Sequence, residues 1–242
     1  MNFENKCNMY KSITLNKRQL CDFELISNNA FSPLNGFLKK KDYESCVLKM
    51  RLQNNKLWCI PITLSINEMQ RDELLHSDYV VLKHETGLPL GLMNISETDS
   101  IYEYDIQKEC ENVYGSYDDN HPYVKILKES YEAGNKYYIG GKIEEFKQPP
   151  HYDFINDRMT PKQTKEYFRQ NGWSKIVGFQ TRNPMHRSHY ELTKYALRVA
   201  GSYGRLFLNP VVGITQDCDI NYHTRVKCYK KLMNYYDKDT AL

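Results

Sequence analysis

Residues 180–189 carry a dense group of side chains that could do chemistry. Four hydrogen-bonding side chains come first, and two histidines three residues apart follow: Gln180, Thr181, Arg182, Asn183, His186 and His189. A guanidinium with amide, hydroxyl and imidazole groups around it is suited to binding oxyanions. Arg187 adds a second guanidinium. The combination predicts an anion site of the kind that a polyphosphate needs.

The residues on either side of this segment indicate the elements that position it. Ile176, Val177 and Phe179 form a short apolar run that predicts a buried strand. Asn183-Pro184 is a turn signal that ends the strand. Ser188 and Glu191 have the spacing of a capping box, so we expect a helix to begin at Ser188.

The predicted helix leads to a second strand. Leu192, Tyr195, Ala196 and Val199 recur at helical spacing and predict its apolar face. Gly201 would end it, and 206–208 would form the next strand of a parallel sheet. Ligands of open α/β sheets bind outside the carboxyl ends of the strands, and a helix N-terminus favours an anion. The segment 180–189 falls at such a position.

The run Gln-Thr-Arg-Asn-Pro-Met-His-Arg-Ser-His resembles the signature loop of ATP sulfurylases (sulfate adenylyltransferases) of the bacterial and fungal single-chain type. Its His-x-x-His part is similar to the phosphate-binding motif of the wider nucleotidyltransferase superfamily. The resemblance implies a reaction that joins sulfate to the α-phosphate of ATP and releases pyrophosphate. No covalent enzyme intermediate is needed, so positioning and charge neutralisation would carry catalysis.

The resemblance also implies a role for each side chain of the loop. Gln180 and Arg182 would bind sulfate, and Thr181 and Asn183 would contact the phosphates of ATP. His186 and His189 would neutralise the leaving pyrophosphate. Mg²⁺ would arrive with ATP and keep most of its waters, so we expect no metal site built from protein side chains alone. The alternative is that the histidines only cap the helix and pack.

The N-terminal part of the chain predicts a β-rich domain. Short strands are expected over 57–64, 79–82, 89–93, 101–104 and 137–143. Pro61 would make the first of them an edge strand or a bulge. The stretch 30–37 resembles an N-terminal segment of ATP sulfurylases, with Asn29 where that family usually has glycine. We therefore expect an α/β protein: a PUA-like, β-barrel-type domain over 1–150, then a truncated Rossmann-like nucleotidyltransferase domain with a parallel sheet over 151–242.

Two features depart from the family pattern. Gln216-Asp217-Cys218 replaces Lys-Pro-Gly, which removes one basic group and adds an acidic one near the anion site. The second loop of the family, Gly-Arg-Asp-His-Ala-Gly, is absent, and the chain stops as a third strand would begin. Thr224–Lys227 brings basic side chains beside another strand-end loop, or forms a solvated helix face.

Three functions therefore remain open. The first is a sulfate adenylyltransferase of which this chain is an N-terminal portion. The second is a catalytically incomplete nucleotide- or anion-binding fragment, or a subunit that needs another chain. The third is an adenylyltransferase with another acceptor, which fits less well because Gln180 and Arg182 suit sulfate.

The composition of the chain limits which kinds of molecule it is expected to bind. The chain has 242 residues and a formal net charge of +3, without the clustered basic stripe typical of nucleic-acid binding. Seven cysteines without a Cys-x-x-Cys pair do not indicate a zinc site. No signal peptide or membrane-length apolar run is recognisable. We expect a cytoplasmic homo-oligomer that binds ATP and sulfate, and no nucleic acid or membrane.

Overall fold

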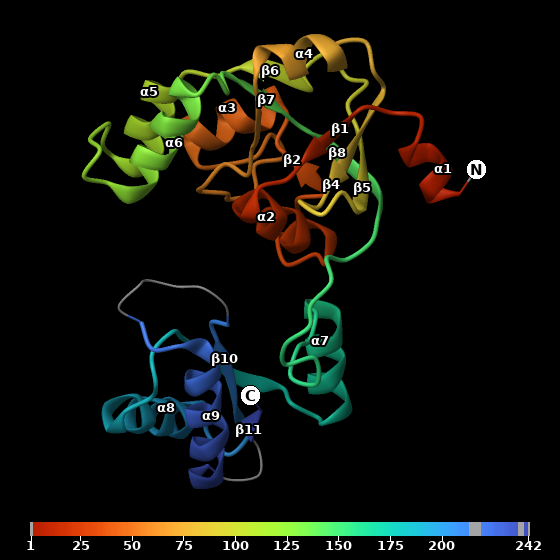
Figure 1. Cartoon of the computed structure of the whole chain (residues 1–242). Helices are drawn as coiled ribbons and strands as arrows, with labels where there is room; N and C mark the ends of the chain where they lie inside the picture. The colour runs from red at the N-terminus through yellow and green to blue at the C-terminus, as the bar shows by residue number, and fades with distance from the viewer. Residues whose placement is uncertain (1, 213–218, 237–239, 242) are drawn as a thin grey trace. The chain divides into compact units, whose positions relative to one another are not determined.

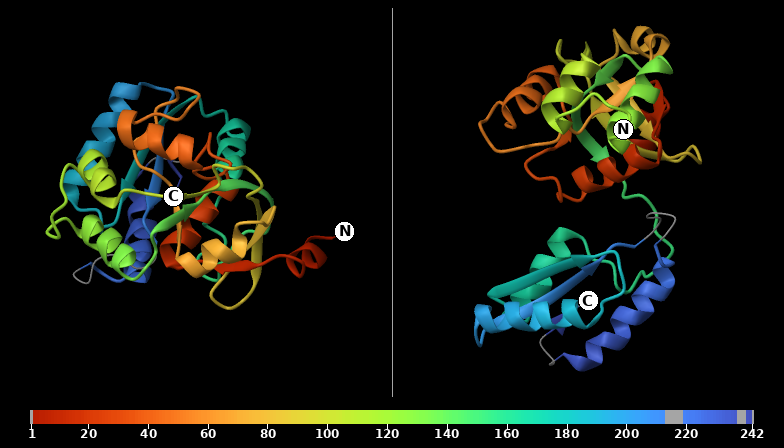
Figure 2. Two further views of the ribbon diagram at one scale, coloured as in Figure 1. Left: turned by 90° about the horizontal axis from the view of Figure 1, so that it is seen from above. Right: turned by 90° about the vertical axis from the view of Figure 1, so that its left-hand side faces the viewer.

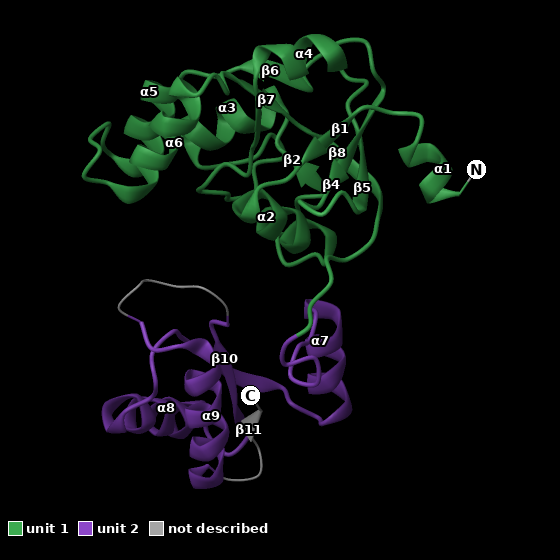
Figure 3. Ribbon diagram, viewed as in Figure 1, with its two compact units in different colours: residues 1–152 green, residues 153–242 purple. Residues whose placement is uncertain are grey.

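The computed structural model describes residues 2–212, 219–236 and 240–241 (Figure 1). The chain divides into two compact units, Met1–Tyr152 and Asp153–Leu242 (Figure 3). The sequence placed the division two residues earlier, between 150 and 151. The described strands form two sheets in the first unit and one in the second, and no hydrophobic cluster of the described residues spans both units. Each unit is described by itself below.

The first unit contains two sheets. The five-stranded sheet has the order β1 (Ser12–Thr14), β4 (Tyr79–Lys83), β5 (Pro89–Asn94), β8 (Gly141–Phe146) and β2 (Gly36–Phe37). Its β1–β4 pair is parallel and its other pairs are antiparallel. The three-stranded antiparallel sheet has the order β3 (Leu64–Ile66), β7 (Tyr137–Ile139) and β6 (Ile101–Glu103). Gly140 joins β7 to β8, where a Cβ would lie 2.1 Å from the carbonyl oxygen of Leu38.

Most strands predicted for this unit are confirmed, but the one over 57–64 is wrong. In that range, all of which the structure describes, Leu57 makes an isolated bridge with Arg51, and a regular strand begins only at Leu64. Pro61 lacks an N–H for a strand ladder, which accounts for the interruption. The predicted strand 137–143 is divided into β7 and β8 at Gly140.

The helices of the first unit lie around these sheets. They are α1 (Phe3–Cys7), α2 (Lys17–Ser27), α3 (Lys40–Lys49), α4 (Glu68–Leu74), α5 (Ile106–Glu109), the π-helical turn η1 (Cys110–Tyr114) and α6 (Pro122–Glu132). Asn16 and Asn67 begin α2 and α4 with complete capping boxes. Asn29, just after α2, has a φ of 65°, which explains why glycine suits that position.

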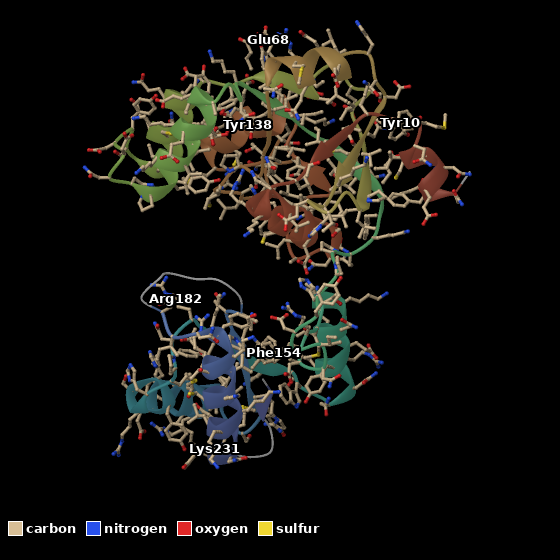
Figure 4. All side chains as sticks on the ribbon, viewed as in Figure 1. Tyr10, Glu68, Tyr138, Phe154, Arg182 and Lys231 are labelled. Carbon is tan, nitrogen blue, oxygen red and sulfur yellow. The ribbon has the colours of Figure 1, made fainter. Side chains whose placement is uncertain are left out.

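A buried carboxyl links three elements of the first unit. The Tyr43 hydroxyl of α3 and the Tyr138 hydroxyl of β7 each donate to Glu109 Oε2 of α5 at 2.9 Å. Tyr138 is labelled in Figure 4. Burial raises the pKa of the Glu109 carboxyl, and the two hydroxyls oppose that shift by stabilising its charged form. The cluster is thus a satisfied polar centre within a mainly apolar core.

The second unit is built on a parallel sheet. Its elements are α7 (Pro161–Gln170), β9 (Lys175–Thr181), α8 (Arg187–Ala200), β10 (Gly204–Pro210), α9 (Tyr222–Leu232), the 3-10 turn η2 (Met233–Tyr235) and β11 (Thr240–Ala241). Strand β10 lies in the middle and pairs in parallel with both β9 and β11. The predicted strand–helix–strand arrangement with parallel pairing is confirmed, and so is the start of a third strand.

The two faces of this sheet are covered differently (Figure 2). Val177 and Phe179 of β9 and Leu206 and Leu208 of β10 form one hydrophobic cluster with side chains of α8, α9 and η2. On the other face, Phe168 of α7 packs edge-on against Phe207 of β10, with ring centroids 5.3 Å apart. In the register of the strands, Gly178 and Gln180 share that second face. A Cβ added at Gly178 would meet no atom within 4 Å.

The apolar face predicted for α8 is wrong. Leu192, Tyr195 and Val199 are 54%, 58% and 71% exposed. The helix instead packs through Tyr190 and Leu197, beside the buried Thr193. Thr193 is compatible with burial because its hydroxyl donates to the Tyr190 carbonyl oxygen at 2.8 Å and lies 2.6 Å from the Tyr236 hydroxyl. Periodicity of apolar residues alone therefore selected the wrong side.

Among the described residues, no helix combines the length and apolar character needed to cross a bilayer.

Candidate functional site

The bend that follows β9 is fixed by local hydrogen bonds. The Thr181 hydroxyl accepts from the Asn183 N–H and donates to the Asn183 carbonyl oxygen, both at 3.1 Å. The Thr181 carbonyl oxygen accepts from the N–H of Val211, just after β10, at 2.9 Å. The bend is therefore tied both to itself and to the carboxyl end of the neighbouring strand.

Helix α9 holds the same bend from inside the unit. Arg225 Nη1 donates to the Arg182 carbonyl oxygen, and the Tyr229 hydroxyl donates to the Asn183 carbonyl oxygen at 2.6 Å. Both α9 side chains are only 1% exposed. Of the two alternatives for Thr224–Lys227, neither is fully correct, because Arg225 is buried while Lys227 is exposed. The sequence did not single out Tyr229; its position four residues after Arg225 on the same helix face was the available signal.

The Arg182 side chain extends from this bend and is about half exposed; it is labelled in Figure 4. Its Nε lies 3.8 Å from Oδ2 of Asp219, whose side chain is buried. This distance is at the outer limit of a salt bridge, and the Arg182 side chain stays accessible to solvent. Gln180 is exposed and lies on the face of β9 opposite Phe179.

The two histidines meet at the start of α8. Their ring centroids are 3.9 Å apart, and the ring planes are inclined by 36°. The Ser188 hydroxyl lies 2.8 Å from His186 Nδ1, and the His186 N–H donates to His189 Nδ1 at 3.4 Å. Partial burial, and secondly the neighbouring His186, lower the pKa of His189. Protonation of the His189 ring is therefore less favourable than protonation of a free histidine.

The N-cap predicted for this helix, Ser188, is two residues late. The cap is His186, and the first helical residue is Arg187. The hydroxyl of Ser188 contacts His186, while His189 takes the place that the predicted capping box gave to Glu191. Arg187 points into solvent: its side chain is 91% exposed, with Nε 3.7 Å from Glu191 Oε1. We therefore remove Arg187 from the predicted anion site.

The residues predicted to bind anions thus form two local groups. Thr181, Arg182 and Asn183 share the bend, and the two histidines share the first turn of α8 only a few residues later. The departures from the family pattern at Gln216, Asp217 and Cys218 lie outside the described residues. Within the described part of the chain, no group of three or more His, Cys, Asp or Glu side chains is arranged to hold a metal ion.

Comparison with known families matches almost all of the chain in two segments. Residues 2–148 match the family of PUA-like domains, and residues 156–242 match the ATP-sulfurylase family. The second match contains the whole of the bend and α8 described above. The chain therefore opens with a PUA-like domain and continues into a segment of the ATP-sulfurylase family.

Individual relatives agree with this assignment. The chain is 42% identical to a sulfate adenylyltransferase of Debaryomyces hansenii, in an alignment that covers 96% of this chain and 44% of the relative. It is 41% identical to one from Kluyveromyces lactis (95% and 44% covered) and 40% identical to one from Schizosaccharomyces pombe (98% and 47% covered). The chain therefore spans less than half the length of these relatives.

A solved structure is similar over nearly the whole chain. The hexameric APS kinase from Thiobacillus denitrificans matches with a TM-score of 0.74 at 22% sequence identity, covering 98% of this chain and 41% of that one. At this identity, the similarity establishes a shared mixed α/β fold.

Proposed function

We propose that this chain provides the ATP- and sulfate-binding loop of a sulfate adenylyltransferase. The reaction joins sulfate to the α-phosphate of ATP and gives adenosine 5′-phosphosulfate and pyrophosphate. The observation that carries the proposal is the bend 180–183 followed by the paired rings of His186 and His189, at the carboxyl end of a parallel strand. Fold and family are consistent with a nucleotidyltransferase unit of Rossmann-like type.

Sulfate would be held by Gln180 and Arg182. The guanidinium is accessible, and its carboxylate neighbour Asp219 is 3.8 Å away, so a tetrahedral oxyanion can take its place. Sulfate is a weak nucleophile and is repelled by ATP, since both reactants are anions. A fixed cation and an amide donor would therefore contribute by aligning it with the α-phosphate.

The phosphates of ATP would lie against Thr181, Asn183 and the two histidines. Charge builds up on the leaving pyrophosphate as its bond to the α-phosphate breaks, and cationic imidazoles at the start of α8 would stabilise that charge. Partial burial, and secondly the neighbouring His186, lower the pKa of His189, so its neutral form is favoured before ATP binds, and a bound phosphate would favour the protonated form. The pair would thus adapt its charge to the bound anion.

Magnesium would enter as a complex with ATP. Mg²⁺ is typically bound by substrate phosphates, one or two carboxylates and waters. We therefore expect the metal to be held mainly by the triphosphate and its waters. Cytoplasmic location and homo-oligomerisation remain predictions.

A second candidate function is suggested by how little of its relatives the chain spans. Because the chain spans 44% of the first two relatives, an ATP- or anion-binding portion that needs further polypeptide for turnover is the alternative. It uses the same loop for binding but lacks the remaining walls of a complete active site. The two candidates differ in turnover, and they agree in binding.

A pyrophosphate-release assay with ATP and sulfate, and with molybdate as a substitute for sulfate, separates these candidates. For the active chain, we expect Arg182→Ala to lower kcat/KM for sulfate by roughly 100-fold or more, as losing a preorganised oxyanion donor does. Arg198→Ala, an exposed arginine in the last turn of α8, is the matched control and should retain activity within about twofold.

The remaining outcomes decide between the candidates. ATP binding, measured by calorimetry, without pyrophosphate release favours the binding portion over the complete enzyme. ATP binding by His189→Ala that is as strong as that of the unaltered chain, or no ATP binding by the unaltered chain, would contradict both.

A further inference from the structure

We propose that Arg225 and Tyr229 are positioning residues, which hold the bend after β9 in the conformation that exposes its anion-binding side chains. The inference rests on the proposed function of that bend. Neither side chain need touch the ligand, because each acts on a main-chain carbonyl. The two groups come from α9, more than forty positions further along the chain, so the bend alone does not reveal them.

The contacts have the form of a two-point clamp. Arg225 donates to the carbonyl oxygen of Arg182, and Tyr229 donates to that of Asn183, the next residue. Holding two successive carbonyl groups fixes the peptide between them. Both donors are almost fully buried, so neither is free to swing away and exchange its partner for water.

The direction of the clamp matters for binding an anion. Carbonyl oxygens carry partial negative charge and repel phosphate or sulfate. Arg225 and Tyr229 draw the carbonyls of Arg182 and Asn183 toward buried donors, while the Arg182 guanidinium remains about half exposed. The clamp therefore keeps the two carbonyl oxygens, which repel an anion, turned toward buried donors, while the Arg182 guanidinium, which attracts an anion, stays accessible.

The two donors suit a permanent clamp. A guanidinium stays charged throughout the physiological range, so Arg225 also keeps a positive charge beside the main chain of Arg182. Burial raises the pKa of Tyr229, which keeps its hydroxyl protonated and able to donate. We expect the clamp to be present with or without ligand.

If Tyr229 only stabilised the fold, its loss should affect stability but not ATP binding in particular. Another buried tyrosine of the same unit serves as a matched control. Tyr236 is also buried in this unit, and its hydroxyl lies 2.6 Å from the Thr193 hydroxyl, in a contact that does not involve the bend. Tyr229→Phe and Tyr236→Phe make the same chemical change, and each removes one buried tyrosine hydroxyl. If the role is only structural, the two variants should behave alike.

The test measures ATP affinity by calorimetry and melting temperature in both variants. We expect Tyr229→Phe to weaken ATP binding roughly fivefold or more, the loss typical of one good hydrogen bond. Tyr236→Phe should bind ATP like the unaltered chain although its melting temperature falls. Arg225→Lys, which keeps the charge, should retain more affinity than Arg225→Met. Equal affinities in the two Tyr→Phe variants would overturn the inference.

Amide hydrogen exchange gives a readout that does not depend on ATP. The N–H groups of Asn183 and Val211 are hydrogen-bonded within the bend and its attachment. Tyr229→Phe should accelerate their exchange several-fold relative to Tyr236→Phe. If the unaltered chain binds no ATP, the proposed function fails while exchange still decides whether the clamp holds the bend. If ATP binds but exchange is alike in both variants, the clamp fails and the proposed function stands.

Discussion

The paired imidazoles of His186 and His189 show how the site could respond to charge. Partial burial lowers the pKa of His189, and the nearby His186 ring, with centroids 3.9 Å apart, lowers it further. The folded, ligand-free protein therefore favours a neutral His189. A polyphosphate supplies the opposite charge, so it should favour the protonated form.

This arrangement gives a pH dependence with a defined sign. The pKa of His189 is lowered from its ordinary value of 6.5, so the unfolded chain binds more protons than the folded one in mildly acidic solution. The contribution of His189 to the free energy of unfolding is fully present above pH 6.5 and is lost as the pH falls through the folded pKa. Pyrophosphate should raise that pKa.

An NMR titration of the His189 ring with and without pyrophosphate measures both effects. His189→Gln, compared with His84→Gln in the first unit, identifies the resonance and controls for general changes of histidine content. A ligand-free pKa above 6.5, or one that pyrophosphate leaves unchanged, would contradict the interpretation.

At the scale of single residues, the sequence indicated part of the candidate site. Arg182, Asn183, His186 and His189 could be chosen because their chemistry is concentrated in one short segment. Arg225 and Tyr229 could not be assigned to the bend, because their contacts depend on how α9 packs. Arg187 was chosen on charge alone, but the first turn of α8 directs it to solvent.

Helix α8 was predicted correctly as an element, but its buried face was not. Its existence, its end near Gly201 and its place between two parallel strands followed from the sequence. Its buried face did not, because Leu192, Tyr195 and Val199 have the right spacing and yet lie on the outside. The face that packs includes Thr193, whose polarity is satisfied by hydrogen bonds that only the fold can show.

The two faces of α8 and its sheet should differ in their contribution to stability. Val199→Thr on the exposed face should change the free energy of unfolding by no more than about 0.5 kcal/mol. Leu208→Ala in the cluster under α8 should lower it by about 2–5 kcal/mol, since Leu208 is buried. Urea unfolding monitored by circular dichroism measures both. Comparable losses would mean that the outer face of α8 is covered in solution.

At the scale of the whole molecule, the two units have separate hydrophobic clusters. The main cluster of the first unit runs from Ile13 to Ile143, and that of the second includes residues from Val177 to Tyr236. The change of composition near Pro149-Pro150 made a division there predictable. A β-barrel-type arrangement was predicted for the β-rich part from its short strands and turn signals, and the described strands of this part form two sheets that Gly140 joins.

We expect residues 1–152 to fold without the second unit. A chain of this length with its own core is within the usual range of independent domains. Expressed alone, it should show a cooperative thermal transition within a few degrees of one seen in the full chain. Loss of cooperative unfolding in this fragment, with the full chain cooperative, would show that its stability depends on residues after 152.

The open space beside Gly178 has a practical consequence. Because an added Cβ would meet no atom there, Gly178→Cys should be accommodated without rearrangement of β9. The new thiol would lie on the same face of the strand as Gln180, two residues away. A small fluorophore attached to it would report the arrival of an oxyanion as a change in emission, which makes this glycine a natural place for an optical sensor of the loop.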